Sequence, residues 1–358
     1  MKYYMPTKIH CERDCVRNYA NEWTALGKKA LIVTGKSSAK NGALADVTEA
    51  LKKSNTPYAI FDETEENPSI EMVMKVRDLG IAENVDFVIG LGGGSPMDAA
   101  KAIALMIYHK EKGADFLYEK GDNTALPVVA IPTTCGTGSE ATAVSVLTIH
   151  AKRTKSSIPH PIFPEYALVD GKYLKSAPKS ILVNTSIDAL AHLLESYINV
   201  KTNPLSTMVC EYGLGLWKDV KSCLLSGNYT EEDYDRLILT STVAGIAIAQ
   251  NGTTVPHGLS YYLTYENHVP HGKAVGYFQP AYLEAAAEDS KKRVLELIGC
   301  KDMEEFNSLI HQLIGPLEVE DDLMEAAVSG LINNKAKIDA VPYEITEDTL
   351  RHFFSMAK

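Results

Sequence analysis

The sequence lacks the features that would point to nucleic acids or membranes. It has 35 Lys and Arg against 46 Asp and Glu, a formal charge of −11, and no basic block. Nucleic acids and anionic membranes need a basic face, so neither is expected as a partner. No apolar run approaches the length of a transmembrane helix, and the first residues, MKYYMPTKIHCERDC, lack the apolar core of a signal peptide. We therefore expect a cytoplasmic protein.

The chain also lacks a disulfide framework. Its six cysteines show no paired spacing, so free thiols are expected. At 358 residues the chain is too long for one ordinary hydrophobic core. We expect two domains.

Two hydrophobic patterns divide the sequence. Short β-rich runs first alternate with helical patterns, which predicts a parallel sheet covered on both faces by helices. Beyond about residue 178 helical periodicity continues without clear strands. We predict a Rossmann-like α/β domain over 1–178 and an all-α domain over 179–358. The expected strands are 30–34, 58–62, 86–91, 127–131 and 166–170; the expected helices are 41–54, 69–82, 96–109, 182–199, 204–225 and 231–250, with a polar loop at 265–273.

A glycine-rich turn follows the expected strand 86–91. Gly92, Gly93 and Gly94 carry no Cβ, so a pyrophosphate can approach backbone N–H groups at the start of a helix. Ser95 is expected to cap this helix, with Asp98 completing a capping box. A plain tight turn is the alternative, because Ser95 breaks the G-x-G-x-x-G dinucleotide pattern.

Two further turns favour a nucleotide site. The segment IPTTCGTGSEAT, 131–142, gathers hydroxyls that can bond a ribose, a carboxamide or a phosphate, or simply satisfy a turn. After strand 30–34, where an acidic residue would accept from an adenosine ribose, the residues are Gly35, Lys36, Ser37 and Ser38. These donors favour NADP(H) over NAD(H), with a surface turn as the alternative.

Four side chains in the second half are typical metal ligands. Asp188 and His192 stand at i and i+4 in a helical pattern, so both leave the same face. His257 and His271 each occur as Pro-His-Gly, where the glycine lets backbone pass close by. One carboxylate and three imidazoles suit Fe²⁺ or Zn²⁺ and argue against calcium, magnesium or copper(I). The alternative is a chance helical Asp-x-x-x-His.

Together these motifs resemble the iron-containing (group III) alcohol dehydrogenases. The resemblance covers nearly the whole chain and is closest to NADP-using, 1,3-propanediol-dehydrogenase-like members. It rests on TGKSSAK, ENPS at 66–69, GGGSPMDAAK, PTTCGTGSE, DALAH and the Pro-His-Gly pair. It implies a dehydroquinate synthase-like two-domain fold and a homodimer. It also implies hydride transfer between a primary alcohol or aldehyde and NADP(H), with a metal as Lewis acid.

The resemblance also implies individual roles. Asp188, His192, His257 and His271 would hold Fe²⁺, with Zn²⁺ as the alternative. Many family members carry another histidine four residues after the third ligand; here that position is Tyr261, which we count as catalytic without expecting a histidine relay. Cofactor contacts are implied at Gly35, Lys36, Ser37, Ser38, Asn67, Gly94, Ser95, Asp98, Thr133, Thr134, Thr142 and Lys155.

Two other functions fit parts of the sequence. A zinc-dependent, glycerol-dehydrogenase-like polyol oxidoreductase would share the fold, and metal analysis with a primary-alcohol assay would separate the two. A nucleotide- or metal-sensing protein without turnover is the alternative from another class. Consumption of NADPH with a short aldehyde would exclude this sensing function without turnover.

Overall fold

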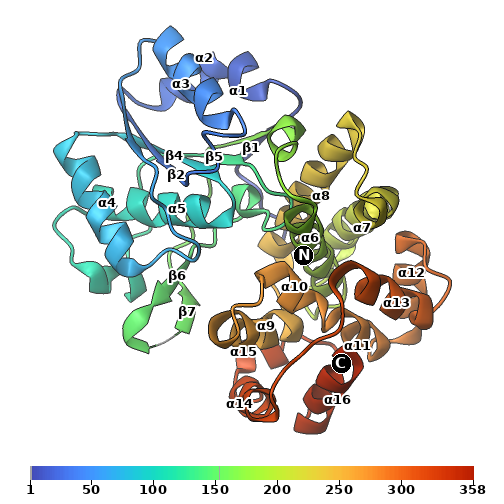
Figure 1. Cartoon of the computed structure of the whole chain (residues 1–358). Helices are drawn as coiled ribbons and strands as arrows, with labels where there is room; N and C mark the ends of the chain where they lie inside the picture. Colours follow the sequence, from blue (N-terminus) through green and yellow to red (C-terminus); the bar gives the residue numbers. More distant parts are fainter. Residues whose placement is uncertain (1, 153) are drawn as a thin grey trace. The chain divides into compact units, whose positions relative to one another are not determined.

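The computed structural model describes residues 2–152 and 154–358, which divide into two compact units. Residues 5–176 form one unit; residues 177–358 and the first residues of the chain form the other. The first contains a parallel sheet with helices and the second is helical (Figure 1), which confirms the predicted fold class. Among the described residues, none of the helices combines the length and the apolar character needed to cross a membrane.

The α/β unit is built on a six-stranded sheet of order β1-β8-β5-β4-β2-β3, in which every pair is parallel. The five predicted strands correspond to β2, β3, β4, β5 and β8, shifted by at most one residue at either end. The bounds are β1 (Lys8–Cys11), β2 (Ala30–Thr34), β3 (Tyr58–Phe61), β4 (Phe87–Gly92), β5 (Val128–Pro132) and β8 (Tyr166–Val169).

Alternate residues of the central strands face opposite sides of this sheet. Leu31 and Val33 belong to a buried core with α4 (Ile70–Ala82) and α5 (Gly94–Tyr108). Ala30 and Ile32 belong to a second core with α3 (Ala43–Lys53), α1 (Cys15–Asn18) and α2 (Ala20–Trp23). Both faces are buried, so the strands appear in the sequence as continuous apolar runs.

Three strands escaped prediction. The edge strand β1, KIHC, is only partly buried and carries no apolar run. Strands β6 (Val146–Ile149) and β7 (Thr154–Ser157) form a separate antiparallel pair, and β7 has the polar sequence TKSS. Sequence periodicity was weak in β1 and β7 because neither strand is buried on both faces.

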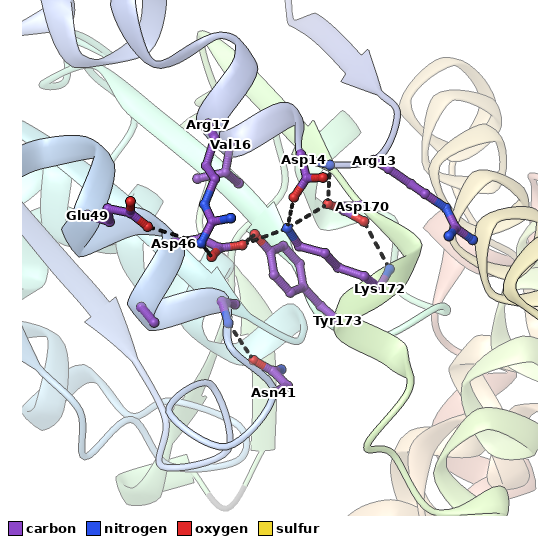
Figure 2. A network of polar contacts seen from close by, with 12 residues as sticks. Arg13, Asp14, Val16, Arg17, Asn41, Asp46, Glu49, Asp170, Lys172 and Tyr173 are labelled. Atoms are coloured by element: carbon purple, nitrogen blue, oxygen red, sulfur yellow. Dashed lines mark hydrogen bonds and ion pairs between the residues drawn. The ribbon is translucent and has the colours of Figure 1, made fainter. Parts of the chain in front are cut away.

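A polar network fastens the N-terminal segment to the sheet (Figure 2). Lys172 Nζ lies 2.5 Å from Asp14 Oδ1, 2.7 Å from Asp46 Oδ2 and 3.3 Å from Asp170 Oδ2. The fully buried Asp170 accepts from the backbone N–H groups of Asp14 (2.6 Å) and Lys172 (2.9 Å), and the Tyr173 hydroxyl donates to Asp46 (2.9 Å). These contacts join α1, α3 and the end of β8.

Helix α6 (Lys179–Tyr197) is the central element of the helical unit. It packs against α7 (Pro204–Ser226), α8 (Glu231–Asn251) and α10 (His271–Gly276), so most of its length is buried. The predicted helices 182–199, 204–225 and 231–250 correspond to α6, α7 and α8. The predicted loop 265–273 is wrong at both ends, because α9 extends to Glu266 and α10 begins at His271. The other helices are α9 (Val255–Glu266), α11 (Gln279–Glu284), α12 (Glu288–Ile298), α13 (Met303–Ile314), α14 (Asp321–Leu331), α15 (Lys335–Ile338) and α16 (Glu347–Ala357).

Candidate active site

The four predicted metal ligands lie together in the helical unit. Asp188 and His192 are one turn apart on α6, His257 lies in the first turn of α9, and His271 begins α10. The Nε2 atoms of His257, His192 and His271 lie 3.5, 3.8 and 3.8 Å from Asp188 Oδ1. Three helices therefore direct three imidazoles at one carboxylate oxygen.

These separations suit a shared cation better than hydrogen bonds. Protein N–H···O bonds measure about 2.7–3.2 Å, whereas two ligands of a tetrahedral ion with bonds of about 2.1 Å lie about 3.4 Å apart. Asp188 Oδ1 and His257 Nε2 are buried without a hydrogen-bond partner among the described residues. Leaving such atoms unpaired is costly, and a cation between them would remove that cost. The donor set fits Fe²⁺ or Zn²⁺.

One side of this cluster is open. The side chains of Asp188, His192 and His257 are 4%, 6% and 3% exposed, whereas that of His271 is 33% exposed. A substrate would therefore approach beside His271. Although burial alone would raise the pKa of Asp188, the surrounding histidines hold this pKa below its usual value. Asp188 is thus ionised, as a metal ligand must be.

Tyr261 lies at the open side. It is one turn beyond His257 on α9, and its ring stacks on that of His271 with centroids 6.1 Å apart and planes at 17°. Lys337 Nζ lies 6.0 Å from the Tyr261 ring centroid. This placement suits a side chain that packs against and orients a ligand.

Glu195 is a site residue that sequence analysis missed. It follows His192 by one turn on the same side of α6 and is fully buried. Its Oε1 lies 2.6 Å from His257 Nδ1. Burial alone would raise the pKa of Glu195, but His257 lowers it to about 2. The available signal was a carboxylate seven residues after Asp188, on the face that carries both α6 ligands.

In the α/β unit the glycine turn joins β4 to α5. Gly92 has φ +146°, a conformation that favours glycine. A Cβ on Gly94 would lie 2.8 Å from Thr137 Cγ2, and one on Gly93 would lie 3.3 Å from the Thr134 side chain. The glycines therefore let the start of α5 pack closely against the turn after β5.

The start of α5 differs from the prediction. The helix begins at Gly94 with Gly93 as its N-cap, and no side chain caps it. The predicted Ser95 cap and Asp98 capping box are therefore wrong. Helix-start N–H groups without a side-chain cap can bind a phosphate.

Ser95 and Asp98 contact neighbouring segments instead. Ser95 Oγ accepts from the backbone N–H of Asn67 (3.0 Å), which has a left-handed φ of 58°. Asp98 accepts from the Ser139 hydroxyl (2.6 Å) and from the Val146 N–H (2.9 Å), and burial raises its pKa. Asp98 therefore stabilises the segment after β5 by hydrogen bonds.

Lys101 is a second residue that the sequence analysis missed. It is fully buried and donates to the carbonyl oxygens of Ser139 (2.7 Å) and Val144 (2.8 Å) and to Thr142 Oγ1 (3.3 Å). The backbone N–H of Thr133 donates to Gly92 O (2.8 Å). Thr133 and Thr142 therefore stabilise the glycine turn after β4 and the turn after β5.

Lys155 is linked to the start of α5 through intervening residues. It pairs with Thr148 in the β6–β7 hairpin, and the Thr148 hydroxyl donates to Asn67 O (2.9 Å). Asn67 in turn donates to Ser95. Two hydrogen bonds and one strand pairing therefore connect three of the predicted cofactor residues: Asn67, Ser95 and Lys155.

The turn after β2 carries the residues predicted to select the cofactor. Ser38 is fully buried and its hydroxyl donates to Leu91 O (3.4 Å), so it is turned away from solvent. Lys36 lines a pocket of about 710 Å³ that also holds Lys75 and several carboxylates: Asp62, Glu63, Glu65 and Glu71. These carboxylates oppose a phosphate in the pocket, so attraction would have to come from Lys36 and its immediate surroundings.

Two family models match the chain: iron-containing alcohol dehydrogenase over residues 6–171, and the C-terminal model of the Fe-containing alcohol dehydrogenase family over residues 182–340. A solved iron-containing alcohol dehydrogenase of Thermotoga maritima is 35% identical, with 99% of each chain covered and a TM-score of 0.92. An NADPH-dependent butanol dehydrogenase of Clostridium saccharobutylicum is 26% identical over 99% of this chain and 97% of its own. A solved 1,3-propanediol oxidoreductase shares the fold at 24% identity, with 100% of this chain and 99% of its own covered and a TM-score of 0.89.

Proposed function

The chain belongs to the iron-containing alcohol dehydrogenase family, and on this basis we propose that it transfers hydride between a primary alcohol or aldehyde and NADP(H). The observation that carries the proposal is the convergence of three imidazoles on Asp188 Oδ1. Asp188, His192, His257 and His271 would hold Fe²⁺.

One unit would bind the metal and the substrate, and the other would bind the dinucleotide. Fe²⁺ in this site would supply Lewis acidity to the oxygen of an alcohol or aldehyde. Residues 179–358 would form the metal and substrate domain, with Tyr261 and His271 lining the open side. Residues 1–178 would bind the dinucleotide, with its pyrophosphate at the uncapped start of α5.

The preference for NADP(H) is the finer part of the proposal. A charge-assisted bond from Lys36 to a 2′-phosphate would be worth about 1.5–3 kcal/mol, which is about tenfold or more in affinity. Gly35→Asp would repel that phosphate and accept from a free ribose hydroxyl. The change is sterically feasible, because a Cβ on Gly35 would have Thr64 O as its nearest neighbour at 3.5 Å.

We expect wild type to favour NADPH and Gly35→Asp to shift the preference toward NADH, mainly through KM because the 2′ position is remote from the hydride. Gly35→Ala adds the same Cβ without charge and is the matched control. The measurement is kcat/KM for both cofactors on all three proteins. A wild type that favours NADH would refute the preference.

An alcohol and aldehyde panel tests the proposed activity as a whole. Protein loaded anaerobically with Fe²⁺ or with Zn²⁺ is assayed with both nicotinamides, and its metal content is measured. Activity on primary alcohols with iron supports the proposal, whereas polyol oxidation with zinc alone supports the glycerol-dehydrogenase-like alternative. The homodimer and the cytoplasmic location stay predictions, and sedimentation measures the first.

A further inference from the structure

The carboxylate of Glu195 is surrounded by groups from three residues of the helical unit, two at the start of α9 and one at the start of α11. Its Oε1 lies 2.6 Å from His257 Nδ1 and accepts from Gln279 Nε2 at 3.1 Å. Its Oε2 accepts from the backbone N–H of Thr254 at 2.6 Å and from the Thr254 hydroxyl at 3.0 Å. All four residues are buried. The carboxylate is therefore fixed on both of its oxygens.

We infer that Glu195 is a positioning residue that fixes the tautomer and the ring orientation of His257. An ionised carboxylate only accepts, so the facing Nδ1 must carry a proton, and a neutral ring then presents its lone pair at Nε2. That Nε2 is the atom 3.5 Å from Asp188 Oδ1. The inference rests on the proposed metal site. A carboxylate that accepts from the second ring nitrogen of a metal-binding histidine also raises the basicity of the nitrogen that binds the metal.

Glu195 also holds the backbone from which His257 projects. Thr254 is the N-cap of α9, and both of its donors bind Oε2, so one side chain anchors the helix start and the ring together. Asp188, His192 and Glu195 occupy positions i, i+4 and i+7 of α6, which lie on one face. A single helix thus supplies two ligands and the group that orients a third.

The test compares metal affinity in full-length variants. Fe²⁺ or Zn²⁺ is titrated anaerobically against a coloured chelator with wild type, Glu195→Gln, Gln279→Met and His257→Ala. Glu195→Gln keeps the shape but replaces one acceptor oxygen with an NH₂ group, so either Thr254 or His257 loses its acceptor. We expect metal binding about 10- to 100-fold weaker, the usual effect of losing such a partner.

Gln279→Met is the matched control. It removes one donor to the same oxygen and leaves His257 its acceptor, so metal affinity should change by less than about threefold. Melting temperatures of the metal-free proteins and NADP(H) dissociation constants report general damage. Losing a buried acceptor lowers the metal-free melting temperature in either case, so the two roles differ in the rise in melting temperature that metal produces. A positioning role reduces this rise and leaves the NADP(H) dissociation constant near wild type, whereas a merely structural role leaves the rise unchanged.

The outcomes separate the inference from the proposed function. If Glu195→Gln binds metal as tightly as wild type while His257→Ala does not, the positioning role is overturned and the metal site stands. If wild type and His257→Ala bind equally weakly, the proposed site itself fails. ¹⁵N NMR of histidine-labelled, Zn²⁺-loaded wild type needs no variant: a proton on His257 Nδ1 supports the inference, and metal on Nδ1 overturns it.

Discussion

The two Pro-His-Gly motifs contain glycines that look alike in sequence but differ in their surroundings. A Cβ on Gly272 would overlap the carbonyl oxygen of Asn184 and lie 2.7 Å from its carbon and 3.0 Å from Asp188 Cβ. A Cβ on Gly258 would overlap only a methyl group of Leu331. Gly272→Ala therefore collides with the backbone of α6, whereas Gly258→Ala meets a side chain that can rotate away.

The size of the effect follows from this contact. To reach ordinary van der Waals separation, α10 must withdraw from α6 by about 1 Å or more. Overpacking of this kind costs about 1–3 kcal/mol, of which better helix propensity offsets about 1 kcal/mol. His271 precedes Gly272 and would move away from Asp188 Oδ1, now 3.8 Å from its Nε2. A misplacement of about 1 Å can lower turnover about 100-fold.

We expect Gly272→Ala to lose metal affinity about tenfold or more and turnover about 100-fold. Gly258→Ala should stay close to wild type in both. The assays are anaerobic metal titration, kcat at saturating alcohol and NADP⁺, and the melting temperature of the metal-free protein. Metal binding by Gly272→Ala that equals wild type would refute the claim that this glycine sets the approach of α10 to α6.

Two further predictions concern the open side of the site and the metal. Tyr261→Phe should change kcat less than about threefold, because a phenol shuttles protons poorly at neutral pH; a loss of several orders of magnitude with metal retained would assign it a proton relay. Aerobic storage should erode activity through loss or oxidation of Fe²⁺, and anaerobic Fe²⁺ should restore it; Zn²⁺ is not redox-active and would show no such cycle. Activity that is indifferent to air and restored only by zinc would contradict the choice of iron.

The sequence located the buried strands and the long helices because burial imposes a periodic pattern. Strands β2, β4 and β5 are buried at every position and so appear as apolar runs. The network around Lys172 has no such pattern, because it joins Asp14 to Asp170, which lie near opposite ends of the α/β unit in the sequence. Contacts between distant residues leave no local periodicity to detect.

The candidate site was partly predictable for the same reason. Asp188 and His192 follow from helical spacing, and the two Pro-His-Gly motifs resemble each other. Glu195 belongs to the same face, yet its part depends on where α9 begins, since its partners are Thr254 and His257. Spacing within one helix cannot reveal a partner on another.

The start of α5 was predicted wrongly for an informative reason. Local rules favour Ser95 as a cap and Asp98 as its capping-box partner, but the Ser95 hydroxyl accepts from Asn67 and the Asp98 carboxylate accepts from Ser139 and Val146. A capping side chain would occupy the N–H groups that a pyrophosphate needs. Engaging both side chains elsewhere leaves the helix start without a side-chain cap. Departure from local rules is expected at functional sites, and here it supports the α5 start as the phosphate position.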